Sequence, residues 1–575
     1  MTQEPASGSE PRRPSADGGA AATADPPRPG RLMRSAPKSV WALVALYGLL
    51  LLSWSVVTPL YHAPDEPNHA DAVVRIYGGL GWPAPAADVF LTGDGLSSWV
   101  ASPYGRRATP LTLNPATIPR SEAVPRKQRP PWRDLRENYP PPPSNTVQLQ
   151  QMVQHPPLYY AVQAAVLKAS PDADDWRWDQ WVGLMRVVSV LLSTALPLLA
   201  WATCMALTSN RSASLVAALL PFSIPQLTHI NSVVNNDNAL ILFSSLVTLG
   251  LACVLRGNVT ARNNVFVGIC TGLALLSKSP ALVLLPMIVA AYLVGARVRR
   301  PAASDVATQQ MREVTARALR PVAGVMLVAF LTGGWWYAYQ ILRTGHVQPT
   351  VPNFPGGVVI DSTSQFFSQA WRLMVLRYWG SIGWYEVTLP FRLTAVASLV
   401  VIGFVAVAVV RTRTRSDRWS LAVLLWPTLS AFVLVVLNSY KFYLDNGRLL
   451  ALQGRYLFEG VIGLAAVVGS GVAAQPHRIV RWAPLAAFAL AGVMQYDALH
   501  LTLQLYWVPS GAGYRAGWNS LTAYAVWPPA LLWVLLILTI AAAVVAVIAV
   551  LPNGLPRGST GGRRAVGAPR GVRAA

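Results

Sequence analysis

The chain has 575 residues, of which 53% are hydrophobic and 13% charged, whereas soluble domains carry roughly 25% charged residues. Lys and Arg outnumber Asp and Glu by 47 to 25, which gives a net charge of +22. This composition excludes a set of ordinary soluble domains. Because no basic-aromatic module accompanies the positive charge, we expect no nucleic-acid partner.

Apolar runs of roughly 20 residues, long enough for a helix to cross the bilayer, predict an all-α polytopic membrane protein with about 12 transmembrane helices. We place the spans at 39–60, 183–207, 213–232, 238–256, 264–277, 280–296, 321–341, 393–410, 419–438, 456–474, 482–500 and 528–551. They form one transmembrane domain, 39–551, between two basic tails, 1–38 and 552–575, that we expect to be disordered and cytoplasmic.

Arginine clusters predict the orientation, because short cytoplasmic loops are enriched in Lys and Arg. The clusters lie at 12–38, 297–320, 411–418 and 557–573. They share one side only if 265–296 forms two short helices, since a single helix would reverse every later loop. Lys278 followed by Pro280 is unfavourable inside a bilayer, so we choose two helices with Lys278 near the outer face. We therefore expect a multi-pass plasma-membrane protein with both termini in the cytoplasm.

Three long segments are then expected outside the membrane, at 61–180, 342–392 and 439–455. The first contains a Pro- and Arg-rich insertion, 84–146, to which the sequence assigns no role. Loops of this length are uncommon unless they carry a function. We therefore expect the functional site at the outer face.

The first outer segment begins with two adjacent carboxylates, Asp65 and Glu66, directly after the first span. Pro67 favours a helix start, and the apolar stripe that follows predicts a short helix lying in the membrane interface. A carboxylate there is favoured in its ionised form and can take a proton from a hydroxyl, so Asp65 and Glu66 are candidate catalytic residues. A helix cap with a solvated loop charge is the alternative interpretation.

Two histidines, His62 and His69, flank this carboxylate pair. Asp65, Glu66 and His69 have the ligand chemistry for a divalent cation that would face a phosphate. Local hydrogen bonding also explains the histidines and is the interpretation that we favour. The cofactor is therefore left unassigned, with a divalent cation as the alternative.

Two further polar motifs are expected at the same face. His155 and Tyr159 belong to the run 155–160, whose prolines fit the start of a helix that dips into the outer leaflet. A simple helix-start turn is the alternative. Asp237 lies in the polar run 235–238 between two spans. A hairpin turn explains this run, and a role in ordering an acceptor is the alternative.

The third outer segment carries three positive charges although Lys and Arg are usually enriched on the cytoplasmic side. These residues are Lys441, Arg448 and Arg455. Because arginine forms paired hydrogen bonds to phosphate, we interpret these residues as candidate ligands of a lipid phosphate. Snorkelling of Arg455 to the interface is the alternative. Trp384, in the second outer segment, belongs either to an interfacial aromatic belt or to a platform for a sugar.

In order along the chain, these motifs resemble those of the GT-C superfamily of membrane glycosyltransferases. The resemblance rests on Asp65-Glu66 and on the runs 155–160, 272–280 and 334–337, which are similar to motifs of protein mannosyltransferases and aminoarabinose transferases. The runs 64–69, 379–384 and 453–456 resemble more closely the bacterial domain-of-unknown-function 2142 family of membrane proteins. The insertion departs from the pattern.

The resemblance implies a GT-C-like bundle that moves a sugar from a polyprenyl-phosphate donor to an envelope glycan, lipid or protein, with inversion of the anomeric carbon. It implies that Asp65 is the catalytic base and that four positively charged side chains bind the phosphate. We assign the phosphate to Arg455, Arg448, Lys441 and Lys278, and other substrate contacts to His69, His155, Tyr159, Trp384 and Asp237.

A secondary transporter, or a lipid or polysaccharide flippase, is the main alternative, because many spans and a broken helix pair also suit that class. Against it, no inverted repeat is evident, and the ionisable residues gather at the outer rim rather than in mid-bilayer. A non-catalytic scaffold of an envelope assembly complex is the third interpretation.

Overall fold

The computed structural model describes residues 26–82, 91–102, 124–141, 150–298, 307–349, 357–450 and 452–551. The predicted disorder at 1–25 and 552–575, and most of the insertion 84–146, lie outside these residues. The tail before the first span is not wholly disordered as expected, because Pro29–Arg34 forms helix α1. Pro29 suits the first helical turn, and α1 packs against α8 and α11.

Within the described residues, ten helical segments are long and apolar enough to cross a membrane. They are built from α2 (Lys38–Val57), α7 (Trp178–Ser193) with α8 (Leu196–Thr208), α11 (Asp237–Leu255), α13 (Leu284–Val298), α14 (Ala307–Ala329) with α15 (Trp335–Thr344), α17 (Phe391–Arg411), α18 (Arg415–Asn446), α19 (Val461–Ala473), α20 (His477–Tyr506) and α22 (Pro529–Val550). The all-α polytopic membrane fold is confirmed.

Two of the predicted spans need separate description. The pair Arg211–Ser223 and Pro225–Asn231 is bent by 70° and gives an eleventh span if it is counted as one. It comprises α9 (Arg211–Leu219), η9 (Leu220–Ser223) and α10 (Pro225–Asn231). Helix α12 (Ala261–Leu275) has 15 residues, which at 1.5 Å per residue is about 22 Å. It packs between α11 and α14 and is shorter than the hydrocarbon core.

The chain breaks between α12 and α13, as predicted. Lys278 has extended backbone, and the 3-10 helix η10 (Ser279–Val283) follows it. Side chains from elsewhere bind carbonyls near the break: the Tyr337 hydroxyl donates to Leu275 at 2.9 Å, and Asn236 Nδ2 donates to Ser277 at 3.0 Å. The break is therefore a stable part of the bundle.

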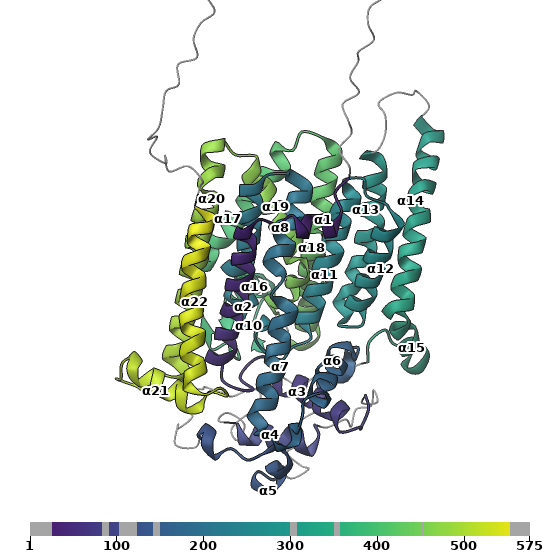
Figure 1. Cartoon of the computed structure of the whole chain (residues 1–575). Coiled ribbons are helices and arrows are strands. Elements are labelled where there is room, and N and C mark those ends of the chain that lie inside the picture. Colours follow the sequence, from purple (N-terminus) through teal and green to yellow (C-terminus); the bar gives the residue numbers. More distant parts are fainter. Residues whose placement is uncertain are drawn as a thin grey trace, which may run out of the picture.

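The outer segments form a second layer at one end of the bundle, opposite α1 and the C-terminal end of α22 (Figure 1). This layer holds α3 (Glu66–Tyr77), α4 (Gly93–Ala101), α5 (Leu135–Asn138), α6 (Leu158–Lys168) and the short 3-10 helices η4 (Arg126–Gln128), η5 (Trp132–Asp134), η7 (Gln151–Gln154) and η8 (Ala173–Asp175). Helix α3 is covered by protein rather than exposed along one side, because Glu66–Val74 are all buried. The polar residues of α3 are hydrogen-bonded to other parts of the chain: Glu66 to Arg186 on α7, and Asp71 to Thr92 and Gln150.

Short elements close the second and third outer segments. Helix α16 (Thr363–Trp379) and the 3-10 helix η12 (Gly454–Gly460) pack together. Strand β1 (Val358–Val359) pairs antiparallel with β4 (Arg448–Leu449), and β2 (Ser381–Ile382) pairs with β3 (Val387–Thr388). The pair β1–β4 therefore joins the second outer segment to the third. The π-helical turn η11 (Phe330–Gly334) lies between α14 and α15.

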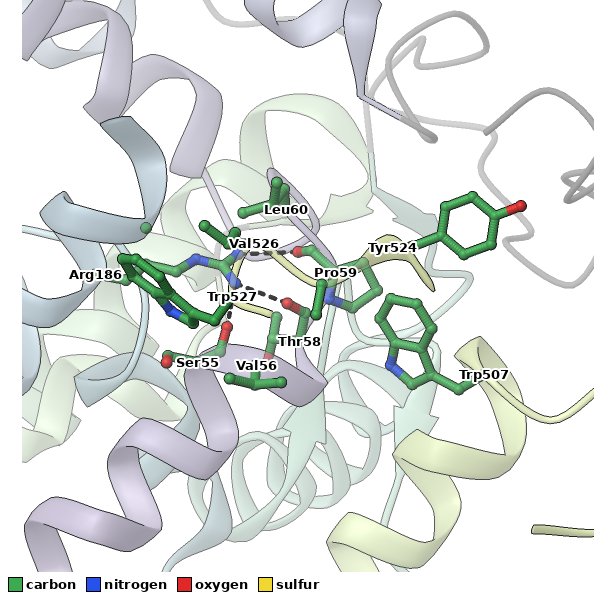
Figure 2. Close-up of a pocket in the computed structure, with 12 residues that line it drawn as sticks. Ser55, Val56, Thr58, Pro59, Leu60, Arg186, Trp507, Tyr524, Val526 and Trp527 are labelled. Atoms are coloured by element: carbon green, nitrogen blue, oxygen red, sulfur yellow. Dashed lines mark hydrogen bonds between the residues drawn. The ribbon is translucent and has the colours of Figure 1, made fainter. Parts of the chain in front are cut away.

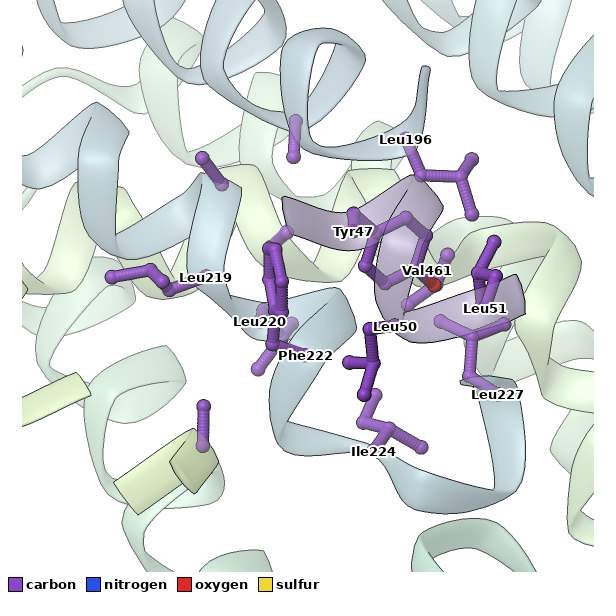
Figure 3. Close-up of a cluster of buried hydrophobic side chains, with 14 of the residues drawn as sticks. Tyr47, Leu50, Leu51, Leu196, Leu219, Leu220, Phe222, Ile224, Leu227 and Val461 are labelled. Atoms are coloured by element: carbon purple, nitrogen blue, oxygen red, sulfur yellow. The ribbon is translucent and has the colours of Figure 1, made fainter. Parts of the chain in front are cut away.

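The main apolar core joins the first span to later helices (Figure 3). Tyr47 on α2 meets Phe222 with ring centroids 4.9 Å apart, and Leu51 and Val461 belong to the same cluster. Trp54 Nε1 donates to Gln495 Oε1 at 2.8 Å. This packing fixes the outer end of α2, from which the acidic motif departs.

The C-terminal helices are tied to the first outer segment. Helix α22 packs along α2, and α21 (Tyr514–Tyr524) precedes it at the outer end (Figure 1). Arginines of the first outer segment donate to carbonyls just before α22: Arg126 to Trp527 at 2.5 Å, Arg129 to Tyr524 at 2.7 Å and Arg177 to Val526 at 2.9 Å. A cavity of about 20 Å³, room for about one water molecule, is lined by Arg186, by the residues just before α22 and by the outer end of α2 (Figure 2).

Candidate active site

The two carboxylates of the acidic motif occupy different environments. Glu66 is fully buried and forms a two-point ion pair with Arg186, with N–O distances of 2.8 and 2.6 Å. Glu66 also accepts a 3.1 Å hydrogen bond from the backbone N–H of Val234. The Asp65 side chain, in contrast, is 29% exposed. Glu66 therefore holds the loop to the bundle, whereas Asp65 can reach a ligand.

Asp65 has left-handed backbone, with φ 61° and ψ 7°, at the first position before α3. Its side chain makes no capping hydrogen bond, which argues against the helix-cap interpretation. Aspartate is among the non-glycine residues that adopt this conformation more readily. The turn directs the Asp65 carboxylate to Arg455, whose Nη2 lies 2.6 Å away.

Arg455 links the acidic motif to the interior of the bundle. It lies in η12, and its side chain is 3% exposed. Its Nε lies 3.9 Å from Asp237 Oδ2, and its guanidinium lies 5.6 Å from the ring centroid of Tyr456. Arg455 Nε has no hydrogen-bond partner among the described residues. A buried guanidinium with a free donor can bind an anion.

Lys278 and Asp237 complete the site. Lys278 Nζ lies 2.6 Å from Asp237 Oδ1 and 5.2 Å from the ring centroid of Tyr456. The structure thus joins Asp65, Arg455, Asp237 and Lys278, all predicted from the sequence, in one alternating chain of charges. We name these four residues the charged cluster. It combines the residue before α3, the start of α11, the break between α12 and α13, and η12.

Buried polar atoms near the charged cluster lack hydrogen-bond partners within the described part of the chain. They are His155 Nδ1, Asp237 Oδ2, the Tyr385 hydroxyl and both carboxyl oxygens of Glu459. Leaving a buried polar group unpaired costs about 1–3 kcal/mol. Such groups are explained when a ligand or water occupies the site, and this set suits a ligand rich in hydroxyl groups.

Glu459 is not among the residues that the sequence analysis selected. It lies four residues after Arg455 in η12 and is 2% exposed, with Asp237 and Lys278 as its charged neighbours. An ionisable residue inside an apolar run marks a functional site in membrane proteins. That signal was present in the sequence, within the span placed at 456–474.

The surroundings of His69 and His155 favour the neutral form of both rings. Burial lowers the pKa of both well below the ordinary 6.5, and the charges of Lys278 and Arg455 lower it further. His69 Nδ1 forms a 2.9 Å hydrogen bond with the Tyr160 hydroxyl. Among the described residues, no three His, Cys, Asp or Glu side chains are placed to hold a metal ion. The His69 geometry agrees with local hydrogen bonding.

Trp384 and Tyr385 lie in the turn between β2 and β3. Tyr385 has left-handed backbone with φ 74°, and the guanidinium of Arg377 lies 4.4 Å from its ring centroid. Burial raises the pKa of Tyr385 to about 12, and Arg455 and Asp65 are among the charges that act on it. Tyr385, the neighbour of the predicted Trp384, is thus a second aromatic residue near the charged cluster, in addition to Tyr456.

A second hydrogen-bonded group holds this turn in place. Glu386 binds both the His62 ring and the Tyr506 hydroxyl, so the β2–β3 turn is tied to the acidic motif and to α20. Gly383 has φ 67°, and a Cβ there would lie 2.0 Å from the Tyr506 hydroxyl. The turn therefore requires glycine at this position.

The other predicted site residues have different surroundings. Lys441 is exposed near the end of α18, and Arg448 is half-buried in β4. No ion pair joins either of them to another residue in the described ranges. The Tyr159 hydroxyl bonds to Ser189 at 2.8 Å and accepts from the Asn235 N–H at 3.0 Å. Tyr159 thus positions the turn that carries Asp237.

A known protein family covers the part of the chain that carries this site. The family described as Predicted membrane protein (DUF2142) matches residues 48–461. The chain belongs to this family. The DUF2142 match includes the whole charged cluster and Glu459, and it ends at the start of α19. The candidate site therefore lies inside the family domain, whereas α20, α21 and α22 lie beyond the matched residues.

Two solved structures are similar to this DUF2142 protein at low identity. The crystal structure of ArnT from Cupriavidus metallidurans bound to undecaprenyl phosphate shares 13% identity, with a TM-score of 0.44, over 89% of this chain and 78% of that chain. The structure of the same protein in the apo state shares 13% identity, with a TM-score of 0.42, over 88% and 77%. No curated protein matches the chain.

Proposed function

We propose that this protein is an integral membrane glycosyltransferase that moves a sugar from a polyprenyl-phosphate donor to an acceptor hydroxyl at the outer face of the plasma membrane. The observation that carries the proposal is the Asp65–Arg455 pair at the head of a membrane span. It sets a partly exposed proton acceptor beside a buried phosphate ligand. Glycosyl transfer from a lipid phosphate needs both groups at one interface.

Arg455 and Lys278 are the groups proposed to bind the phosphate. Both are buried cations, with Tyr456 between them, and Arg455 Nε has no described hydrogen-bond partner. A phosphate oxygen would take the place of the Asp65 carboxylate on Arg455, which releases Asp65 toward the acceptor. Charged hydrogen bonds of this kind contribute about 1.5–3 kcal/mol each.

The reaction uses these groups as follows. Asp65 accepts the proton of the acceptor hydroxyl, and the hydroxyl oxygen forms a bond to the anomeric carbon. The bond from that carbon to the phosphate oxygen breaks, and its electron pair stays on the phosphate. Arg455 and Lys278 stabilise the charge that develops there. Attack opposite the leaving phosphate inverts the anomeric carbon.

The unpaired polar atoms support a sugar as the transferred group. Glu459 and Asp237 offer carboxyl oxygens, and His155 and Tyr385 offer a ring nitrogen and a hydroxyl. Sugar hydroxyls both donate and accept hydrogen bonds, so they can satisfy this mixed set. We infer an envelope glycan, lipid or protein as the acceptor, with both termini of the chain in the cytoplasm.

The deciding experiment is incubation of the purified full chain with radiolabelled polyprenyl-phosphate sugars and envelope acceptors. The expected result is transfer of label by wild type and loss of transfer in Asp65→Asn. Reconstitution in liposomes tests the rival function. Movement of the labelled lipid across the bilayer without transfer to any acceptor would instead identify a flippase.

A further inference from the structure

A second candidate site lies at the opposite end of the bundle from the outer layer (Figure 1). A hollow of about 570 Å³ separates α1 from the start of α12. This volume is within the usual range of ligand sites, roughly 300–1,000 Å³. Four arginines are among the residues that line it: Arg28, Arg31, Arg34 and Arg262.

The hollow is held in shape by contacts between segments that are distant in the sequence. Asn258 Nδ2 donates to the Pro27 carbonyl at 2.9 Å, which fixes the start of α1 to the turn between α11 and α12. Asn263 is buried and donates to the carbonyls of Gly250 and Asn258 at 3.2 and 3.1 Å. The arginines of α1 are therefore presented by the folded bundle.

Within the part of the chain that the structure describes, the charges that line the hollow are all positive. No carboxylate is among the described residues that line it. Elsewhere at this end of the bundle, Arg256 pairs with Asp417 at 2.9 Å. Like charges gathered around one space repel one another, and a bound anion offsets this repulsion. Guanidinium geometry matches phosphate oxygens in particular.

An apolar stripe leads away from the arginines along α12. Phe266 lines the hollow, and Val265 and Ile269 are 46% and 42% exposed. These positions lie three to seven residues after Arg262 and share a helix face. Exposed apolar side chains on a membrane helix face lipid chains. A phosphate group at the arginines would thus continue into an acyl chain along α12.

We propose that the hollow between α1 and α12 binds the phosphate headgroup of an anionic membrane lipid, whose acyl chain follows the apolar stripe of α12. The site is separate from the charged cluster and does not depend on its function. Arginines of α1 and α12 would hold the headgroup together, so the bound lipid would join α1 to the bundle.

The test uses the delipidated full chain in detergent and native mass spectrometry with added phosphatidylglycerol or phosphatidylcholine. Wild type is expected to retain phosphatidylglycerol in preference to phosphatidylcholine. The triple variant Arg31→Gln, Arg34→Gln, Arg262→Gln is expected to bind it at least about tenfold more weakly, because each charged hydrogen bond to phosphate contributes about that factor or more.

The matched control is Arg411→Gln, Arg413→Gln, Arg415→Gln, which removes three exposed charges in another arginine cluster. It is expected to bind phosphatidylglycerol as wild type does. Equal loss in both triple variants would overturn the site in favour of general surface charge, as would wild-type binding by the first variant. Full competition by inorganic phosphate would overturn the lipid assignment in favour of a soluble ligand.

Discussion

At the scale of single residues, the acidic motif divides two adjacent carboxylates between two tasks. Asp65 is partly exposed and faces Arg455, whereas Glu66 is buried and satisfied by Arg186. We expect Asp65→Asn to lose about 10²–10⁴-fold in turnover, because the amide cannot accept a proton. Asparagine also tolerates left-handed backbone, so the fold and donor binding should survive. Turnover and donor affinity are the measurements, and near-normal turnover would remove Asp65 as the base.

Glu66→Gln is the comparison that separates chemistry from stability. It leaves the buried Arg186 without its charged partner, and breaking such a pair costs about 3–5 kcal/mol. The unfolding temperature should therefore drop in Glu66→Gln and stay near the wild-type value in Asp65→Asn. Thermal unfolding in detergent measures both. A stable but inactive Glu66→Gln protein would transfer the catalytic role to Glu66.

Glu459 allows a test in which stability and activity move apart. Both of its carboxyl oxygens lack described partners, so Glu459→Met removes an unpaired polar group at similar volume. The unfolding free energy should stay level or rise by up to about 1–3 kcal/mol, while transfer of the sugar falls. Calorimetry and the transfer assay give the two values. A clearly destabilised variant would show that Glu459 has a structural role instead.

The buried histidines predict acid sensitivity. The folded-state pKa of His69 lies well below 6.5, so the unfolded chain binds a proton that the folded chain excludes, and stability falls as pH drops below 6.5. Asp71 opposes this, because burial raises its pKa from 3.8 to about 6 and the folded chain takes up that proton first. Between about pH 7 and pH 5, the unfolding temperature of His69→Gln should fall less than that of wild type. The Asp71 effect is common to both proteins, and equal slopes would contradict the prediction.

At the scale of secondary-structure elements, the position of η12 depends on one glycine. A Cβ at Gly454 would lie 2.3 Å from the backbone nitrogen of Tyr378, so alanine there must push η12 away from α16 and shift Arg455. We expect Gly454→Ala to lower both stability and transfer. Gly492→Ala on α20 is the matched control, because a Cβ there meets no described atom within 4 Å. Thermal unfolding and sugar-transfer assays on the two variants test this prediction. Wild-type stability and transfer in Gly454→Ala would contradict it.

The apolar runs and the Lys278-Pro280 break predicted ten of the twelve proposed spans, because membrane helices follow local rules of length and polarity. The runs 213–232 and 264–277 differ, because the first is bent and the second is short. The burial of α3 could not be predicted in this way. Its polar side is covered by partners far along the chain: Glu66 binds Arg186, and Asp71 accepts from Gln150 at 2.6 Å. Local periodicity carries no information about such partners, so the stripe alone suggested an interfacial helix.

Some residues of the candidate site could also be predicted from the sequence, and others could not. The charged cluster was found because each member is a charged residue at the predicted outer end of a span. Lys441 and Arg448 satisfied the same rule, yet no described ion pair brings them to Asp65. Tyr385 was missed because the features that distinguish it from Trp384 appear only in the folded structure. They are its left-handed backbone and its buried hydroxyl.

At the scale of the whole molecule, the orientation in the membrane is open to direct measurement. Single cysteines at positions 372 and 448 should react with a membrane-impermeant reagent in intact cells, and a cysteine at 413 should react only after the cells are opened. The native Cys204, Cys253 and Cys270 are buried, so they are shielded from a water-soluble reagent in the folded protein. Labelling at 413 but not at 372 in intact cells would reverse the proposed orientation.

The neighbouring positions of α2 and α22 have a consequence for biosynthesis. The first and last spans pack together although roughly 470 residues separate them, which a ribosome needs roughly 25–95 s to add. During that interval the face of α2 that α22 covers stays open to lipid. The carbonyls of Tyr524 and Trp527 have also not yet been made, so Arg129 and Arg126 have none of these acceptors. The outer layer can therefore reach its final form only after the last helix has entered the membrane.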